Sequence, residues 1–275
     1  MKLRFNKKTT KKLILVIVFI INFGVGSYAQ TKVESGQSSE KTKIFKLEKK
    51  STKINIDLVN AVIEGHSGNE VAIFLQTSKK NIDERAKGLK SVNGLGLKDN
   101  TGLGINVTEV EGVIKVSQMN TADTSNIKIL VPYWMIISFE HQSKFGKAVY
   151  FRNIRGEIEV STNENSIYLE NVSGPVNIKT VQGNVEAIFQ DNVKGPISIV
   201  SIYGDVDIAL PQTTRSDLKM NAKFGEILVA EEFKLEVQIK EHKPRYSNQV
   251  TGKINGGGLN IDLRSDNGKI YLRTK

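Results

Sequence analysis

Four carboxylates in the C-terminal half are the side chains whose types and spacing could support chemistry. Each occupies an outward position in a series of short, alternating, repeated segments: Glu170, Glu186, Asp205 and Asp207. If alternate segments stack as strands, these side chains approach one another along one face. Such a face could bind Ca²⁺ through oxygen ligands, or supply an acid and a base for cleavage of a polysaccharide. In the competing interpretation, which we favour, the charges only keep the wet face soluble, because equivalent positions hold Asn177, Lys179 and Ser198.

No other set of residues has the spacing of a catalytic or metal site. The three histidines, His66, His141 and His242, lie far apart, and the chain has no cysteine. It also lacks the HExxH and GxSxG motifs of zinc and serine hydrolases. Ser67 follows His66, but neighbours on a turn seldom point at one another, so we expect a hairpin turn there. The sequence therefore predicts a non-enzymatic protein with no catalytic residues, no metal and no cofactor.

Tyr133 and Trp134 form a second candidate surface. They open an aromatic cluster that continues, just before the regular repeats, through Phe139, Phe145, Tyr150 and Phe151. Exposed aromatic rings bind sugars and protein partners. A solenoid also needs its first rung covered, and we expect the cluster to serve mainly as that cover. Tyr133 and Trp134, together with the Gly-rich loop 88–104, remain the places where we would look for a binding surface.

A repeat that begins at Asn153 must position these side chains. Three units align, namely NIRGEIEVSTNENSIYLE, NVSGPVNIKTVQGNVEAIFQD and NVKGPISIVSIYGDVDIALP. Each unit contains two copies of a phrase in which Gly or Asn precedes alternating polar and apolar residues. The phrase begins at Gly156, Asn165, Gly174, Gly183, Gly195 and Gly204. Self-similarity at this period is typical of stacked solenoids.

The alternation within each phrase predicts a short strand with one wet face. Pairs such as Ile158 and Val160 fall on the same side, with polar residues between them. Stacking such strands about 4.8 Å apart buries a continuous apolar column. We expect the glycines to supply corners with positive φ. The Asn that opens each unit suits a turn, or alternatively a stacked Asn ladder.

Strand signals continue outside the regular repeats. We expect strands at 53–59, 71–75, 104–107, 113–116 and 127–131, one short helical turn at 82–87, and a second loop at 242–257 before two final strands. The predicted fold class is all-β, a β-solenoid with Gly and Asn corners. Its parts are residues 1–29, a signal peptide, residues 30–131, an N-terminal β region continuous with the solenoid, and residues 132–275, the repetitive solenoid.

The N-terminus predicts export. Six basic residues and no acid precede an apolar run from Leu13 to Phe23, and small residues at Ser27 and Ala29 suit cleavage after Ala29. This run has the length of a signal peptide, whereas a spanning helix needs about 20 residues; an uncleaved anchor is the alternative. Cleavage lowers the formal net charge from +10 to +4, because the leader holds six basic residues. We therefore expect a periplasmic, secreted or cell-surface chain with no nucleic-acid partner and no transmembrane segment.

Several phrases together resemble a known family. The GxIxI phrases, the DNTGLG segment at 99–104, ILVP at 129–132 and the closing GGGLNIDLRSDNGKIYL are similar to the bacterial "putative adhesin" family of β-strand-repeat proteins of unknown function. The resemblance covers roughly residues 43–275. It implies an exported β-solenoid of the cell envelope and brings no catalytic residues.

Three functional hypotheses follow from the repeat and the resemblance. The first is a non-enzymatic solenoid that presents a binding or adhesion surface to an envelope protein or glycan. The second is a carbohydrate-active enzyme, or a Ca²⁺-dependent glycan binder, that uses the acidic strand face. The third is a structural or envelope-stress-related periplasmic module. Fold alone does not choose among them.

Overall fold

The computed structural model describes residues 31–32, 44–45, 51–76, 84–119, 126–239 and 248–275. The predicted signal peptide, residues 1–29, lies outside the described residues. Strands dominate the described chain, and its helical content is one 3-10 turn, η1 (Glu84–Ala86), inside the predicted helical segment. None of the described helical residues forms a helix long and apolar enough to span a bilayer.

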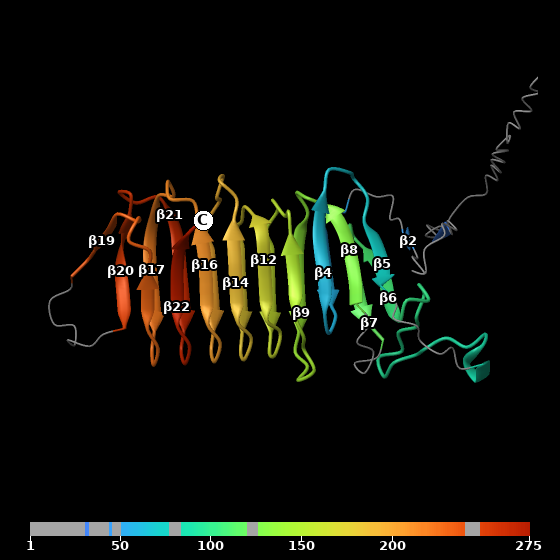
Figure 1. The fold of residues 1–275 in the computed structure, drawn as a ribbon. Coiled ribbons are helices and arrows are strands. Elements are labelled where there is room, and N and C mark those ends of the chain that lie inside the picture. The colour runs from blue at the N-terminus through green and yellow to red at the C-terminus, as the bar shows by residue number, and fades with distance from the viewer. Residues whose placement is uncertain (1–30, 33–43, 46–50, 77–83, 120–125, 240–247) are drawn as a thin grey trace, which may run out of the picture.

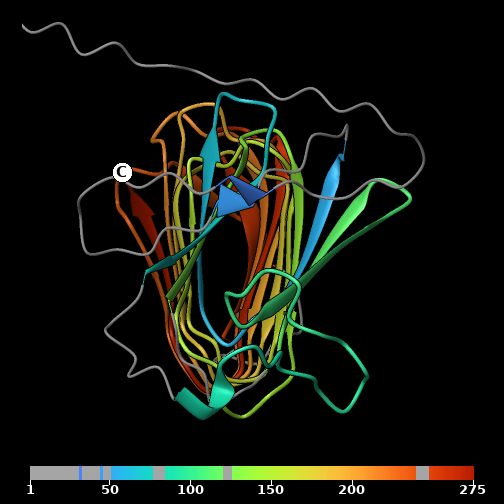
Figure 2. The ribbon, with the colours of Figure 1, turned by 90° about the vertical axis from the view of Figure 1, so that its right-hand side faces the viewer.

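Two large sheets face each other across one core (Figures 1 and 2). The described part of the nine-stranded sheet has the order β18 (Ile227–Val229), β22 (Ile270–Thr274), β16 (Val206–Leu210), β14 (Val185–Phe189), β12 (Ile167–Val172), β10 (Val149–Arg152), β4 (Ala61–His66), β8 (Asn126–Pro132) and β5 (Ala72–Gln76). The described part of the eleven-stranded sheet has the order β19 (Leu235–Val237), β20 (Gln249–Ile254), β17 (Ser216–Ala222), β21 (Leu259–Ser265), β15 (Ile197–Ser201), β13 (Val176–Thr180), β11 (Ile158–Thr162), β9 (Ile136–His141), β3 (Lys53–Asp57), β7 (Val113–Gln118) and β6 (Ile105–Val110). Separately, β1 (Thr31–Lys32) pairs with β2 (Ile44–Phe45).

One strand from each sheet, joined by a corner, forms a rung, and the rungs stack in parallel register. Ile178 of β13 aligns with Val160 of β11 on one side and Ile199 of β15 on the other. All three side chains are buried, and the residues between them along each strand are wholly or partly exposed. Each apolar side chain therefore packs on its equivalent in the next rung. The predicted all-β solenoid and its inward and outward faces are confirmed.

The order of rungs along the stack differs from their order along the chain. Reading the two sheets together, the sequence of rungs is β7/β8, β3/β4, β9/β10, β11/β12, β13/β14, β15/β16, β21/β22 and β17/β18. The last rung of the chain, β21/β22, is therefore inserted between β15/β16 and β17/β18. At the other end β3/β4 lies between β7/β8 and β9/β10. Figure 1 shows β22 beside β16, one rung from the β17/β18 end of the stack.

Antiparallel strands extend both ends of the stack. At one end β5 pairs with β8 and β6 pairs with β7, both antiparallel. At the other end β20 pairs with β17 and β19 pairs with β20, again antiparallel. These strands cover parallel edges that would otherwise offer free hydrogen-bonding groups to another chain. The prediction of a loop at 242–257 is wrong, because this segment contains β20. The strand was missed because Gly252 interrupts its alternation of polar and apolar residues.

A second correction concerns the segment around His66. Glu64 and Gly65 precede it within β4, which pairs in parallel with both β8 and β10, so these residues are not a hairpin turn. Tight packing explains the glycine, since a Cβ on Gly65 would overlap the carbonyl oxygen of Asn153 in the adjacent rung. His66 Nε2 lies 2.8 Å from the carbonyl oxygen of Glu70 and Nδ1 accepts from the Gly68 amide at 3.0 Å. The ring thus organises the chain after β4.

Buried hydroxyls hold the corners between the sheets. Ser201 Oγ donates to the carbonyl of Gly183 at 2.8 Å and accepts from the amide of Gly204 at 2.9 Å. Ser265 repeats the arrangement one rung further, donating to the carbonyl of Gly204 at 2.9 Å. Both serines are fully buried, so these bonds replace water at the turns. Each corner is thereby tied to the preceding one.

The corner glycines are needed for close approach more than for positive φ. Among the phrase-opening glycines only Gly174 has a positive φ, of 89°, which corrects the expectation for the others. Positive φ is found instead at Asn153 and Asn171, both at 57°. Asn171 Nδ2 also donates to Asn153 Oδ1 at 2.6 Å, so these two asparagines combine the turn with one step of a side-chain ladder.

Replacing Gly204 by Ala is expected to destabilise the protein by about 1–3 kcal/mol, the usual cost of overpacking. Its Cβ would overlap the carbonyl oxygen of Gly183, which is fixed by Ser201 and cannot withdraw. Thermal unfolding followed by far-UV circular dichroism measures the change. Gly94→Ala is the matched control, because a Cβ there meets no atom within 4 Å. Equal melting temperatures for the two variants would contradict the packing argument.

Candidate binding surfaces

The structure brings together two of the four predicted carboxylates. Glu186 of β14 aligns with Asp207 of β16 on the outward face of the nine-stranded sheet. Glu170 of β12 aligns with Ile188 and so lies two positions further along the strands. Asp205 lies before β16, in the corner, where its Oδ1 accepts from the amide of Lys269 at 2.7 Å. The four side chains therefore do not form one group, and their role in binding stays a prediction.

Arginines pair with two of the four carboxylates on this face, Asp207 and Glu170. Arg273 Nε donates to both oxygens of Asp207, at 2.8 and 3.0 Å, and this hydrogen bond raises the pKa of Arg273. Arg152 Nε lies 3.1 Å from Glu170 Oε2. No group of three or more His, Asp or Glu side chains in the described part of the chain is placed to hold a metal ion. The arrangement is that of ion pairs between rungs.

A row of tyrosines, which sequence reasoning missed, lies on the same face. Tyr150 and Tyr168 occupy adjacent rungs in register and stack with ring centroids 4.9 Å apart and planes 16° from parallel. The pKa of Tyr168 is raised, mainly because the side chain is partly buried, and the nearby Glu186 carboxylate adds to the rise. Tyr271 continues the row beyond Asp207. The signal was present, because Tyr150 and Tyr168 are one 18-residue repeat apart.

The predicted aromatic cluster divides into core and corner residues. Tyr133 and Trp134 lie in the corner between β8 and β9, where Trp134 is 42% exposed. The Arg155 guanidinium lies over the Tyr133 ring at 4.6 Å. Phe139 and Phe151 are buried edge to face, with centroids 6.3 Å apart. Because β3/β4 and β7/β8 stack beyond this point, the cluster does not cover an end of the solenoid, and that expectation is wrong.

A shallow groove crosses the outward face of the eleven-stranded sheet. It consists of two adjoining hollows of about 290 and 350 Å³ that share Ser138 and Glu140. They run over the consecutive strands β7, β3, β9, β11 and β13, which corresponds to about 19 Å along the stack. Short side chains make the depression: the floor is formed around Asn55, Ser117, Ser138 and Ser161.

Polar groups of several kinds line this groove. Carboxylates are supplied by Asp57, Glu140 and Glu159, and cations by Lys115 and Lys179. Asn55 Oδ1 is buried and has no hydrogen-bond partner among the described residues. A buried acceptor without a partner costs free energy, which a bound donor would recover. The groove therefore presents donors and acceptors suited to a hydroxyl-rich ligand.

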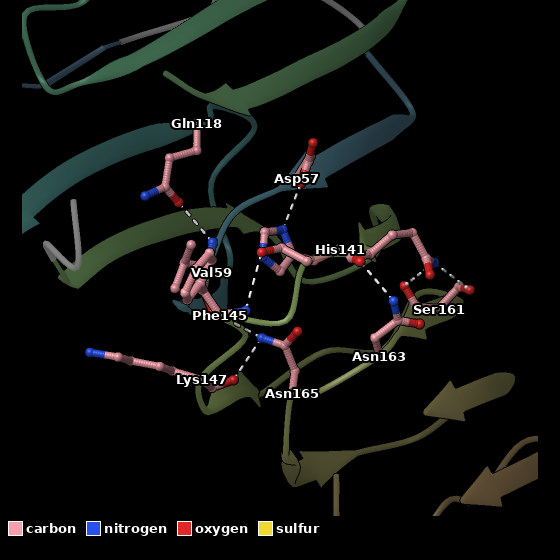
Figure 3. A network of polar contacts seen from close by, with 11 residues as sticks. Asp57, Val59, Gln118, His141, Phe145, Lys147, Ser161, Asn163 and Asn165 are labelled. Atoms are coloured by element: carbon pink, nitrogen blue, oxygen red, sulfur yellow. Dashed lines mark hydrogen bonds and ion pairs between the residues drawn. The ribbon is translucent and has the colours of Figure 1, made fainter. Parts of the chain in front are cut away.

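A polar network fixes one wall of the groove (Figure 3). His141, buried at the end of β9, places Nδ1 2.8 Å from Oδ1 of the exposed Asp57. Below it, Asn165 Nδ2 donates to the carbonyls of Val59 at 2.9 Å and Lys147 at 2.6 Å. These contacts join three rungs at one corner. Asp57 is thus oriented by a rigid buried ring, and the composition of the sequence held no sign of this pairing.

Residues 153–273 match a family model described as Toastrack DUF4097. This part of the chain is similar to Toastrack domains. The match confirms the resemblance drawn from the repeated phrases, and it spans the rungs from β11/β12 to β21/β22. The groove lies partly in the segment that matches this family model, through β11 and β13, and partly on the preceding strands β7, β3 and β9.

The chain is also similar to two solved structures. One, a "putative cell adhesion protein" from Clostridium sporogenes, has 12% identity and a TM-score of 0.47, covering 86% of this chain and 100% of its own. The other, a "putative adhesin" from Bacteroides fragilis, has 14% identity and a TM-score of 0.34, covering 82% and 93%. No curated protein matches the chain.

Proposed function

We propose that the protein is an exported, non-enzymatic binding module that holds a linear glycan in the groove of the eleven-stranded sheet. The observation that carries the proposal is a groove five strands long that polar side chains line, with the unpartnered Oδ1 of Asn55 buried beneath its surface. The predicted signal peptide supports export. The family resemblance supports a place in the envelope.

The chemistry of the groove favours a glycan over a protein segment. Its lining offers hydroxyl, amide, ammonium and carboxylate groups, which match the donors and acceptors of sugar hydroxyls. The large apolar anchors that dominate protein interfaces are missing from the exposed side chains among these lining residues. Strands repeat at about 4.8 Å, so a polymer of pyranose rings can meet a polar side chain at each step.

The acidic face is the weaker candidate for catalysis. A general acid and base would need two carboxylates facing one substrate, with one of them held protonated. Asp207 is instead bound by Arg273, and Glu170 lies beside Arg152, so both carboxylates are engaged in ion pairs between rungs. We therefore assign Asp207 and Glu170 to the ion pairs between rungs.

Filling the groove tests the glycan proposal. Ser138→Tyr puts a bulky side chain on the outward face of β9 without touching the core, and we expect it to lower affinity for a binding oligosaccharide at least about tenfold. Glycan-array screening of the wild-type protein followed by calorimetric titration provides the measurement.

Ser198→Tyr is the matched control for this experiment. Ser198 lies on β15, the strand after β13, where it aligns with Asn177 of β13. It lies outside both hollows. Its affinity should equal that of the wild type. Loss of binding in both variants, or in neither, would exclude the groove as the glycan site. If the array instead yields no ligand and an envelope protein binds the groove, the glycan assignment is wrong.

A further inference from the structure

We propose that residues 84–98, hereafter the basic loop, contact an anionic phospholipid surface. This goes beyond glycan binding and concerns a different part of the molecule. The loop carries four basic residues and one acidic residue: Arg85, Lys87, Lys90, Lys98 and Glu84. Between the cations it exposes three aliphatic side chains, Leu89 at 74%, Val92 at 57% and Leu95 at 85%.

The tip of the basic loop is ordered rather than extended. Asn93 Oδ1 accepts from the amides of Leu95 and Leu97, both at 3.0 Å. The backbone amide of Asn93 also donates to the carbonyl of Leu97 at 3.1 Å, and the carbonyl of Asn93 accepts from the amide of Gly96 at 3.0 Å. Val92 and Lys98 form a bridge just below this turn. A short hairpin therefore presents Leu95 outward, so that little conformational entropy opposes its insertion.

The base of the loop is fastened to the end of the solenoid. Asn100 exchanges two hydrogen bonds with Val107 of β6, at 2.7 and 2.9 Å, and Asn106 Nδ2 donates to the carbonyl of Lys98 at 2.7 Å. Asp99 accepts from four donors in the following turn, of which the amide of Gly102 is nearest at 2.6 Å. Figure 1 shows η1 and the loop standing away from the stack.

The combination of charges and aliphatic side chains selects a bilayer over other anionic partners. Lys and Arg gain from the negative potential of anionic headgroups, while Leu and Val gain from the acyl boundary. A nucleic acid or an acidic polysaccharide would pair with the cations and leave Leu95 in water. The glycan groove lies on the outward face of the eleven-stranded sheet, so membrane contact at this end leaves that face available.

A single fluorophore beside Leu95 reports directly on contact. The chain has no cysteine, so Gly94→Cys provides a unique labelling site in the full chain, and a Cβ at Gly94 meets no atom within 4 Å. We expect an environment-sensitive label there to shift to the blue, and to be quenched by brominated lipid, on vesicles of phosphatidylglycerol and phosphatidylcholine. Thr213→Cys, exposed near the other end of the stack, should show neither change. The local readout separates loop contact from any binding by the apolar run 13–23.

Variants that remove charge or an apolar side chain from the basic loop test whether both contribute to lipid contact. Lys87→Gln with Lys90→Gln should weaken the quenching response about 25-fold in lipid concentration, since each basic residue near an anionic surface contributes about fivefold. Leu95→Ser should also weaken it, and both variants should melt like the wild type. An unquenched label at position 94, or equal quenching on pure phosphatidylcholine, would overturn the proposal. The proposal would also be overturned if the label responded to soluble polyphosphate but not to vesicles. The same holds if the label responded only to rising protein concentration.

Discussion

Replacing Ile178 by Asp is expected to unfold several rungs of the solenoid together. Ile178 is fully buried between Val160 and Ile199 of the adjacent rungs, so the carboxylate would enter an apolar column with no partner. The loss of packing and the buried charge together cost at least about 4 kcal/mol. In a chain of this size the melting temperature should fall by on the order of 10 °C. Differential scanning calorimetry measures both quantities.

Asn177→Asp is the control for that experiment. It introduces the same carboxylate one residue away, on the exposed face of the same strand. Its melting temperature should lie within about 2 °C of the wild type, because surface substitutions usually change stability by less than about 0.5 kcal/mol. If Ile178→Asp melted like Asn177→Asp, the assignment of inward and outward faces would be reversed.

A chain that ends at Gly258 is expected to lose the end of the stack beyond β16. The missing residues form the rung β21/β22, which lies between β15/β16 and β17/β18. Four buried side chains go with it: Ile261, Leu263, Ile270 and Leu272. Burial of these groups is worth about 6–12 kcal/mol before the entropy of ordering them is subtracted. Amide hydrogen exchange should show that β17 and β20 lose their protection.

A chain that ends at Thr274 serves as the control, since it keeps both inserted strands and removes only Lys275. Its hydrogen exchange should match that of the complete protein. The prediction fails if β17 pairs directly with β15 in the shortened chain, closing the gap by one rung. In that case β17 would remain protected and the melting temperature would change little.

The sequence predicted the strands of the repeats well, for a definite physical reason. Residues such as Ile158, Val160, Val176 and Ile178 alternate with polar residues, and only a strand places every second side chain on one face. All four are buried as expected. The corner positions were also correct, because Gly183 and Gly204 can tolerate backbone contact that any other residue would prevent.

The order of rungs and the groove could not be predicted from the sequence. Every rung offers similar apolar columns, so the phrase at Leu259 to Leu263 fits beside β15 or beyond β17 equally well by pattern alone. The groove depends on that order: Lys115 and Ser138 come to lie on either side of Asn55 only because β3 is inserted between β7 and β9. The pairing of His141 with Asp57, 84 positions apart, depends on the same insertion.

The insertion of rungs also determines how the molecule carries mechanical load. In chain order β3 is the first strand of the stack and β22 is the last. In space both lie inside the stack, each with one further rung beyond it. A pull between Lys53 and Lys275 therefore acts on the rungs from β3/β4 to β21/β22, across the ladder hydrogen bonds of both sheets at once. The rungs β7/β8 and β17/β18, with their antiparallel covers, stand outside this line of force. We therefore expect these two end rungs to carry no load until the section between them yields.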